Sequence, residues 1–189
     1  ISAAKDCGMD GINLDFESIK EDEAIHYTQL VRELSIACRK NGLVFSVDDP
    51  VPTFSSHYNR RVQGQVADYV IMMGYDEHFS GSDTAGSNAS LSFVETGIQD
   101  TLKEVPANKL ISAMPFYTRL WIESYENGSL ECQTLSMTDA NAYAKDKQME
   151  IYWDAASGQN VAELDTEENL QKMWLEDEQS LTEKMKLID

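Results

Sequence analysis

Short apolar segments alternate with segments of helical periodicity from residue 11 to residue 114. The short apolar segments cover residues 11–16, 43–47, 67–73 and 109–114. Between them, residues 22–39 and 91–105 place apolar side chains at helical spacing, residues 57–65 form a weaker helical stretch, and the two prolines of 48–52 predict a loop. This succession is typical of a parallel sheet covered by its helices, so we predict an α/β fold.

The succession changes after residue 117. Two β-rich runs flank Asn127-Gly128, which predicts a hairpin with a tight turn. A short helix capped by Ser136 or Thr138, three further short strands and a last helix over 180–188 follow. We therefore expect three segments. They are residues 1–117 as the α/β part, residues 118–175 as a small α+β lobe, and residues 176–189 as a helix that returns from the lobe.

The first strand carries the most informative pattern for function. Residues 10–17 read Asp-Gly-Ile-Asn-Leu-Asp-Phe-Glu, and alternate side chains of a strand point to opposite faces. The two faces carry, respectively, Ile12, Leu14 and Phe16, and Asn13, Asp15 and Glu17. The apolar face suits packing against helices, whereas paired acids at the end of a buried strand cost folding free energy and indicate a catalytic site. Acids at a strand end can also only cap a helix or face water, and the pattern alone leaves both interpretations open.

The octapeptide resembles the Asp-Gly-x-Asp-x-Asp-x-Glu signature of family 18 glycoside hydrolases, the chitinase-like group. Asn13 stands where the family usually has the first Asp, as in the branch that resembles bacterial spore-cortex and spore-germination hydrolases. Three further segments resemble family motifs in the family's order. They are Met73-Gly74-Tyr75-Asp76, then Met114-Pro115-Phe116-Tyr117-Thr118-Arg119 with Thr118 in place of the usual glycine, and Trp174-Leu175-Glu176-Asp177 with Ser180 and Lys184.

The resemblance implies a partial (β/α)₈ TIM barrel. The four apolar segments would be the fourth to seventh barrel strands, residues 118–175 would be a lobe inserted after the seventh, and the first three strands and the eighth would be absent. We therefore interpret the chain as a piece of a longer polypeptide. A partial barrel has open sheet edges and an exposed apolar face, so we expect it to associate with itself.

The resemblance also implies an activity. Family members cleave β-1,4 bonds at N-acetylglucosamine with retention, by substrate-assisted catalysis. Glu17 would be the general acid/base, Asp15 would stabilise the acetamido nitrogen, and Tyr75 would hydrogen-bond the acetamido carbonyl. The residues that would bind the sugar are Asn13, Met73, Asp76, Tyr117 and Arg119. We expect no cofactor and no metal, and we expect this chain alone to be inactive because part of the substrate floor would be missing.

Two alternatives stay open. The chain could be a non-catalytic carbohydrate-binding relative, although retention of Glu17 argues against this, or a structural module, since fold does not fix function. We interpret Trp121, Trp153 and Trp174 as core residues, with Trp121 or Trp153 as a sugar platform being the alternative.

Composition narrows the class of partner. The formal net charge is −18, and a polyanion is repelled by nucleic acid and by anionic lipid. A neutral or cationic glycan, such as peptidoglycan or chitin oligomers, is compatible with this charge. No apolar run is long enough to cross a membrane, and Cys7, Cys38 and Cys132 have no metal-ligand spacing. From the resemblance we expect an extracellular, cell-wall or spore-associated location.

Overall fold

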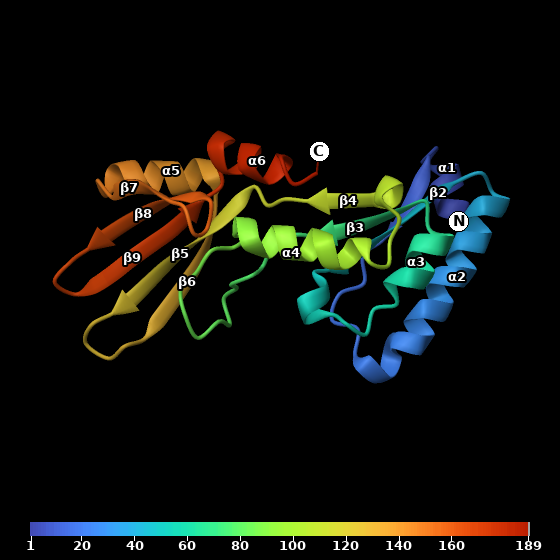
Figure 1. Ribbon diagram of the computed structural model, residues 1–189, viewed down its shortest axis with the longest axis horizontal. Helices are drawn as coiled ribbons and strands as arrows, with labels where there is room; N and C mark the ends of the chain where they lie inside the picture. Colours follow the sequence, from blue (N-terminus) through green and yellow to red (C-terminus); the bar gives the residue numbers. More distant parts are fainter. Residues whose placement is uncertain (189) are drawn as a thin grey trace. The chain divides into compact units, whose positions relative to one another are not determined.

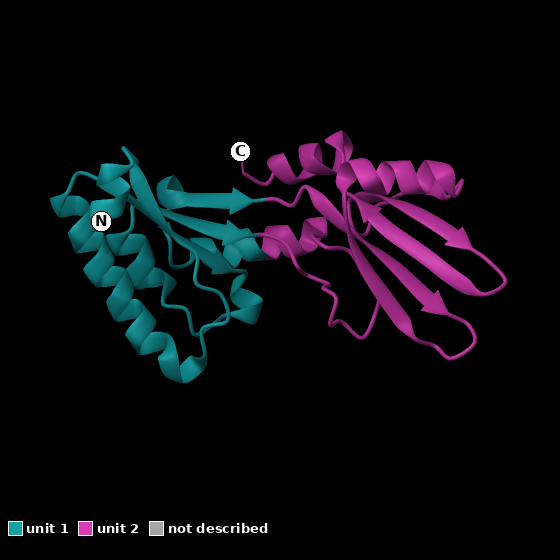
Figure 2. Cartoon of the chain, turned by 180° about the vertical axis from the view of Figure 1, so that it is seen from behind, with its two compact units in different colours: residues 1–73, 97–113 teal, residues 74–96, 114–189 magenta. Residues whose placement is uncertain are grey.

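The computed structural model describes residues 1–188 (Figure 1). Asp189, the last residue of the predicted returning helix, lies outside the described residues. The chain forms two compact units (Figure 2). The first consists of residues 1–73 and 97–113, and the second consists of residues 74–96 and 114–189.

The first unit is built on a four-stranded parallel sheet, as predicted. The strands are β1 (Gly11–Leu14), β2 (Val44–Pro50), β3 (Tyr69–Met73) and β4 (Leu110–Ala113), and they lie in this order. The helices of this unit are α1 (Ser2–Asp6), α2 (Ala24–Lys40), α3 (Arg60–Val66) and the second half of α4 (Leu91–Leu102). Single 3-10 turns lie at Glu21–Glu23, Pro52–Phe54 and Ala107–Lys109. Of these helices, α1 was not predicted from the sequence.

One face of the parallel sheet packs against the helices and forms the core. Leu14, Phe45 and Val47 are buried there with Tyr27 and Val31 of α2. Figure 1 shows α2 and α3 along this part of the sheet. The prediction that the apolar face of the first strand packs against helices is therefore confirmed for Leu14.

Phe16 departs from that prediction. Strand β1 ends at Leu14, so the alternation of faces does not extend to Phe16, whose side chain is 49% exposed. Its ring instead stacks on Tyr27 with centroids 6.3 Å apart.

The predicted loop over 48–52 is also wrong in part, because β2 continues through Pro50. Proline lacks an N–H and cannot donate to a neighbouring strand, and Pro50 is the last residue of β2. Its carbonyl accepts hydrogen bonds from the Ser55 hydroxyl and from Nη2 of Arg60, which fix the exit of the strand.

The second unit is built on a five-stranded antiparallel sheet. Its strands are β5 (Tyr117–Ser124), β6 (Leu130–Ser136), β7 (Glu150–Asp154), β8 (Gln159–Asp165) and β9 (Asn169–Leu175), in the order β6-β5-β9-β8-β7. Helix α5 (Met137–Asp146) is capped by Ser136, one of the two predicted caps, and buries Ala140 and Ala144 against the sheet. Helix α6 (Glu178–Met185) ends the unit.

Helix α6 is fastened to the lobe by buried polar contacts. The ammonium of Lys184 pairs with Glu176, and both side chains are fully buried. Glu176 also accepts hydrogen bonds from Ser180 and from Gln159 of β8, at 2.9 and 2.8 Å. Burial raises the pKa of Glu176 and lowers the pKa of Lys184, and their mutual attraction opposes both shifts. These contacts explain why residues 176–188 group with the lobe, whereas the sequence suggested a separate segment.

Several apolar side chains remain exposed on the first unit's sheet. Val44 and Tyr69 alternate with the buried residues of β2 and β3 and therefore lie on the opposite face, and Ile111 of β4 pairs with Ile71 on this same face. Among the described residues, no helix has the length and apolar character that a membrane span requires.

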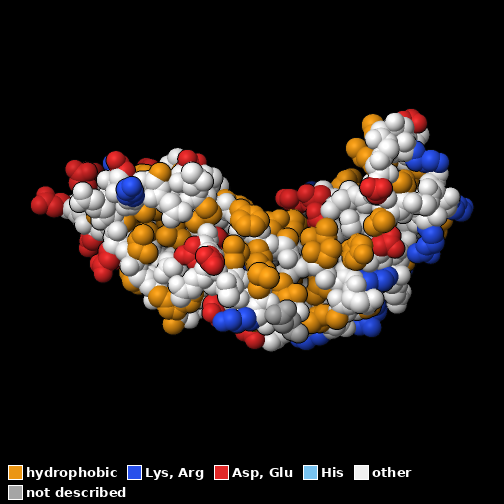
Figure 3. All heavy atoms as spheres, turned by 90° about the horizontal axis from the view of Figure 1, so that it is seen from above, with side chains coloured by type: hydrophobic (Ala, Val, Ile, Leu, Met, Phe, Trp, Pro, Cys, Tyr) orange, Lys and Arg blue, Asp and Glu red, His pale blue; other side chains and the backbone are white. Residues whose placement is uncertain are grey.

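Most of the acidic excess lies in the second unit, and carboxylates are prominent on the surface in Figure 3.

Candidate active site

The signature octapeptide positions its acids through the close approach of β1 to β2. The strands pair in parallel, with Gly11 opposite Val44 and Leu14 opposite Val47. A Cβ atom at Gly11 would lie 2.5 Å from the carbonyl oxygen of Val44, so only glycine fits at this approach. The glycine of the octapeptide therefore permits the pairing that holds the residues after it.

Asn13 makes a contact that the sequence did not predict. Its Nδ2 donates a hydrogen bond to Oδ1 of Asp48 on β2, at 2.9 Å. Burial raises the pKa of Asp48, the Asn13 hydrogen bond lowers it, and the negative charge of Asp15 raises it again, for a net increase. Asp48 is thus electrostatically coupled to Asp15.

Asp15 and Glu17 follow directly after β1 and are exposed. The backbone turns just beyond them, because Ser18 has a φ of 58°, in the left-handed region. The carboxyl ends of parallel strands are where α/β folds place their functional side chains. The structure therefore brings Asn13, Asp15 and Asp48 together at this end of the sheet, with Glu17 two residues beyond Asp15.

Met73, another predicted sugar-binding residue, ends β3 in the same unit. It pairs with Pro50 of β2 on one side and with Ala113 of β4 on the other. It therefore also lies at the carboxyl end of its strand.

The remaining predicted site residues lie in the second unit. The rings of Tyr75 and Tyr117 meet edge to face, with centroids 6.1 Å apart. Asp76 accepts hydrogen bonds at Oδ1 from the Tyr117 hydroxyl at 2.8 Å and from Nη2 of Arg119 at 2.6 Å. The φ of Asp76 is 61°, which is unusual for a residue with a side chain and is frequent at functional sites. The structure thus groups Tyr75, Asp76, Tyr117 and Arg119 in one polar cluster.

Arg119 makes a hydrogen bond from each of its three guanidinium nitrogens. Besides the pair with Asp76, its Nε donates to the carbonyl of His78 at 3.0 Å and its Nη1 to the hydroxyl of Thr134 at 2.9 Å. Burial lowers the pKa of Arg119, but the hydrogen bond and charge of Asp76 outweigh this and raise it overall. Burial, together with the hydrogen bond to Asp76, raises the pKa of Tyr117 to about 12. Both groups therefore keep their protons at neutral pH and act as donors.

Thr118 replaces the glycine of the family motif for a structural reason. It is buried, and its hydroxyl donates to the carbonyl of Trp174, which ties β5 to β9. Trp121 is also a core residue, as interpreted from the sequence, because it is buried and its indole N–H donates to the carbonyl of Gly86 at 2.9 Å. Trp153, in contrast, lies on the edge strand β7 and is 37% exposed.

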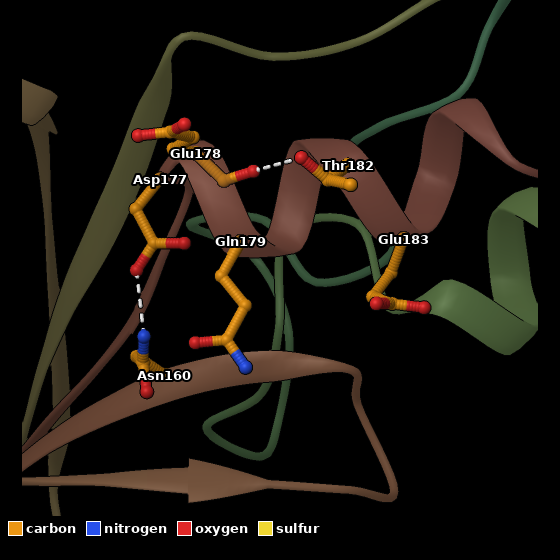
Figure 4. Close-up of a pocket in the computed structure, with 6 residues that line it drawn as sticks. All are labelled: Asn160, Asp177, Glu178, Gln179, Thr182 and Glu183. Atoms are coloured by element: carbon orange, nitrogen blue, oxygen red, sulfur yellow. Dashed lines mark hydrogen bonds between the residues drawn. The ribbon is translucent and has the colours of Figure 1, made fainter.

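One polar hollow of about 500 Å³ lies at the start of α6 (Figure 4). It is lined by Asn160, Asp177, Glu178, Gln179, Thr182 and Glu183. Asp177 accepts there from Asn160 at 2.7 Å and also caps α6 through the N–H of Ser180. None of the predicted site residues lines this hollow. In the part of the chain that the structure describes, no group of three or more His, Cys, Asp or Glu side chains is arranged to hold a metal ion.

A family model described as "Glycosyl hydrolases family 18" matches residues 1–189. The chain belongs to this family. The cortical fragment-lytic enzyme of Bacillus subtilis is 26% identical over 196 residues, a match that covers 100% of this chain and 45% of that enzyme. The chain therefore spans less than half of the length of this relative.

Solved structures show the same fold. The spore cortex-lytic enzyme SleL of Bacillus cereus superposes with a TM-score of 0.86 at 23% identity, over 99% of this chain and 44% of that one. The chitinase of Chromobacterium violaceum superposes with a TM-score of 0.85 at 23% identity, over 95% of this chain and 57% of that one. The predicted family and the α/β, TIM-barrel-like fold class are confirmed, whereas the roles of the individual site residues stay predictions.

Asp48 is the polar residue of this site that sequence reasoning missed. The signal was present, because Val44–Pro50 alternates between faces as β1 does. Placing residues 48–52 in a loop removed Asp48 from the strand. Continuing the strand and pairing it in parallel would have put Asp48 beside the acids of the octapeptide.

Proposed function

We propose that the protein containing this chain is a glycoside hydrolase that cleaves β-1,4 bonds at N-acetylglucosamine with retention. The observation that carries the proposal is the family match over the whole chain together with Asp15 and Glu17 at the carboxyl end of β1. Names of similar proteins refer to spore cortex and to chitinase activity, which supports peptidoglycan or chitin-like glycans as substrates. An extracellular, cell-wall or spore-associated location follows from these substrates and is part of the proposal.

Glu17 supplies the proton in this proposal. It protonates the oxygen of the leaving sugar, while the substrate's own acetamido oxygen attacks the anomeric carbon and forms an oxazolinium ion. Asp15 stabilises the acetamido nitrogen of this ion. A water molecule, deprotonated by Glu17, then attacks the anomeric carbon and opens the oxazolinium ring. The product therefore retains the configuration of the substrate.

The remaining predicted roles are also part of the proposal. Tyr75 hydrogen-bonds the acetamido carbonyl, and Asn13, Met73, Asp76, Tyr117 and Arg119 bind the sugar. Tyr117 and Arg119 both donate hydrogen bonds to Asp76, which supports a common role of these three residues in one sugar-binding cluster. Turnover measured after substitution of each of these residues tests its role separately from that of Glu17.

We also propose which part of a (β/α)₈ barrel this chain forms. Strands β1 to β4 correspond to the fourth to seventh strands of a (β/α)₈ barrel, with residues 118–175 as the lobe inserted after the seventh. A four-stranded parallel sheet with exposed Val44, Tyr69 and Ile111 supports this view. We propose that the 189-residue chain alone is inactive and associates with itself through this open sheet. Light scattering after size exclusion tests association, and a monomer at high concentration would argue against it.

The decisive experiment for the function compares turnover of peptidoglycan and of N-acetylglucosamine oligomers by two proteins. These are the longest natural polypeptide that contains this sequence and its Glu17→Gln variant. We expect the variant to lose a factor of about 10²–10⁴ in kcat. The Glu33→Gln variant, which makes the same change on an exposed part of α2, should keep wild-type turnover. Equal rates for wild type and Glu17→Gln would exclude the role of Glu17, and sugar binding without turnover would favour a carbohydrate-binding protein.

A further inference from the structure

Asp15, directly after the end of β1, lies near Asp48 of β2. Leu14 pairs with Val47 in the parallel register, and Asp15 and Asp48 are the residues that follow them. Because neighbouring strands lie about 4.8 Å apart, residues at matching positions are close neighbours. The negative charge of Asp15 contributes to the raised pKa of Asp48, as expected for two like charges that lie near each other.

Asp48 is held in this position by Asn13. The amide of Asn13 donates to Oδ1 of Asp48 at 2.9 Å and so fixes the carboxylate on the same sheet face as Asn13. The next residue, Asp49, points to the other face, where it is 1% exposed and accepts from Gln63. The two consecutive acids therefore have different surroundings, and only Asp48 belongs with Asp15.

A pair of neighbouring carboxylates favours a positive charge beside it. Each ionised group raises the free energy of the other, and a cationic group placed next to both relieves this repulsion. In the proposed reaction, the substrate becomes cationic only when its acetamido group attacks the anomeric carbon. A second fixed carboxylate at this place would therefore act on the transition state more than on the bound substrate.

We infer that Asp48, held by the amide of Asn13, is a further residue of the proposed reaction and stabilises the cationic intermediate together with Asp15. Asn13 is then the orienting group of Asp48. This inference rests on the proposed function, since it needs a substrate that develops positive charge next to Asp15.

The test uses kcat and KM for an N-acetylglucosamine oligomer, in the longest natural polypeptide that contains this sequence. Asp48→Asn keeps the shape of the side chain and removes its charge, so we expect kcat to fall about tenfold with little change in KM. Asp48→Glu, which keeps the charge, should recover much of the loss. Asp6→Asn makes the same chemical change on the exposed surface of α1 and should leave both constants unchanged.

A double-variant cycle then separates positioning from a merely structural role. If Asn13 acts through Asp48, Asn13→Ala and Asp48→Asn should each lower kcat, and the double variant should be no slower than Asp48→Asn alone. Asn13→Asp should shift the acid limb of the pH–rate profile, because it adds a titrating group to the pair.

Losses that add in the double variant, or an Asp48→Asn enzyme as fast as Asp6→Asn, would overturn the inference. Those outcomes leave the proposed function intact as long as Glu17→Gln still lowers kcat by a factor of about 10²–10⁴. A wild-type protein without turnover would instead remove the proposed function, on which the inference rests.

Discussion

The two units hold their polar side chains in different ways. In the first unit, Asn13 and Asp48 are placed by strand alternation and by the register of two parallel strands, and Asp15 follows directly after the first of these strands. In the second unit, Asp76 and Arg119, which are 43 positions apart in the chain, are placed by direct hydrogen bonds between side chains. Glu176 and Lys184 are likewise held by contact inside the lobe. A backbone pattern can therefore be followed in the sequence, whereas a side-chain network becomes visible only after folding.

This difference predicts where single substitutions cost the most stability. Lys184→Met removes the partner of Glu176 and leaves a buried carboxylate without its cation. We expect the free energy of unfolding to fall by about 3–5 kcal/mol. Denaturant unfolding of the 189-residue chain, followed by the fluorescence of the lobe tryptophans, measures this change.

The exposed neighbour provides the control. Lys186 pairs with Glu183 on the surface, so Lys186→Met should change the free energy of unfolding by less than about 1 kcal/mol. Similar effects of the two substitutions would show that the buried pair does not anchor α6, and the contrast between the units would then fail.

The first unit contains one buried ion pair of its own, and it should respond to pH. Asp49 lies 3.8 Å from Nε of Arg60, and burial raises the pKa of Asp49 to about 6 although Arg60 and Gln63 oppose the shift. Between about pH 4 and pH 6 the folded chain keeps this proton while the unfolded chain releases it. The stability contribution is therefore complete below the unfolded pKa and decreases as pH rises toward 6, by an amount on the order of 3 kcal/mol.

Thermal unfolding of the wild type and of Asp49→Asn across pH 4 to 7 measures this contribution. We expect the variant to lack the wild-type decrease in this window, while Asp6→Asn keeps it. Parallel pH profiles for wild type and Asp49→Asn would contradict the assignment.

A smaller effect should come from the cap of α3. Oδ1 of Asn59 accepts from the N–H of Val62 at 3.1 Å, and removing such a cap costs about 1 kcal/mol. Asn59→Ala should therefore lower the free energy of unfolding of the chain by about this amount, whereas Asn108→Ala, at an exposed position of the same unit, should not. If Asn59→Ala lowered the free energy of unfolding by much more than Lys184→Met does, the first unit and not the second would contain the substitution with the larger effect, which would contradict the expected order.

Much of the first unit could be predicted from the sequence because its signals are local. The four strands and helix α2 follow from apolar periodicity, and the pattern correctly placed Leu14 in the core. The prediction was wrong at the ends of two strands. Strand β1 stops before Phe16, although the apolar alternation continues, and β2 continues into Pro50, although its apolar run ends earlier. The second error hid Asp48, because a residue assigned to a loop has no register.

The lobe was harder to divide because long-range contacts decide its limits. The loop residue Ser87 donates to Gln159 of β8, and Gln159 donates to Glu176, so residues far apart in the chain form one buried network. Nothing in the periodicity of residues 74–96 indicates that they belong with the lobe. The motif around Trp174 was recognised by resemblance, but only the structure indicates that its Glu, Ser and Lys stabilise the position of α6.

The role of Glu17 as the proton donor is the central claim, and it is tested most directly by changing the leaving group. An oligomer of N-acetylglucosamine needs a proton on its leaving oxygen, whereas an aryl glycoside of the same sugar with an acidic phenol departs without one. The account predicts that Glu17→Gln loses at least about 100-fold more kcat/KM on the oligomer than on the aryl glycoside. Equal losses on the two substrates would contradict the account.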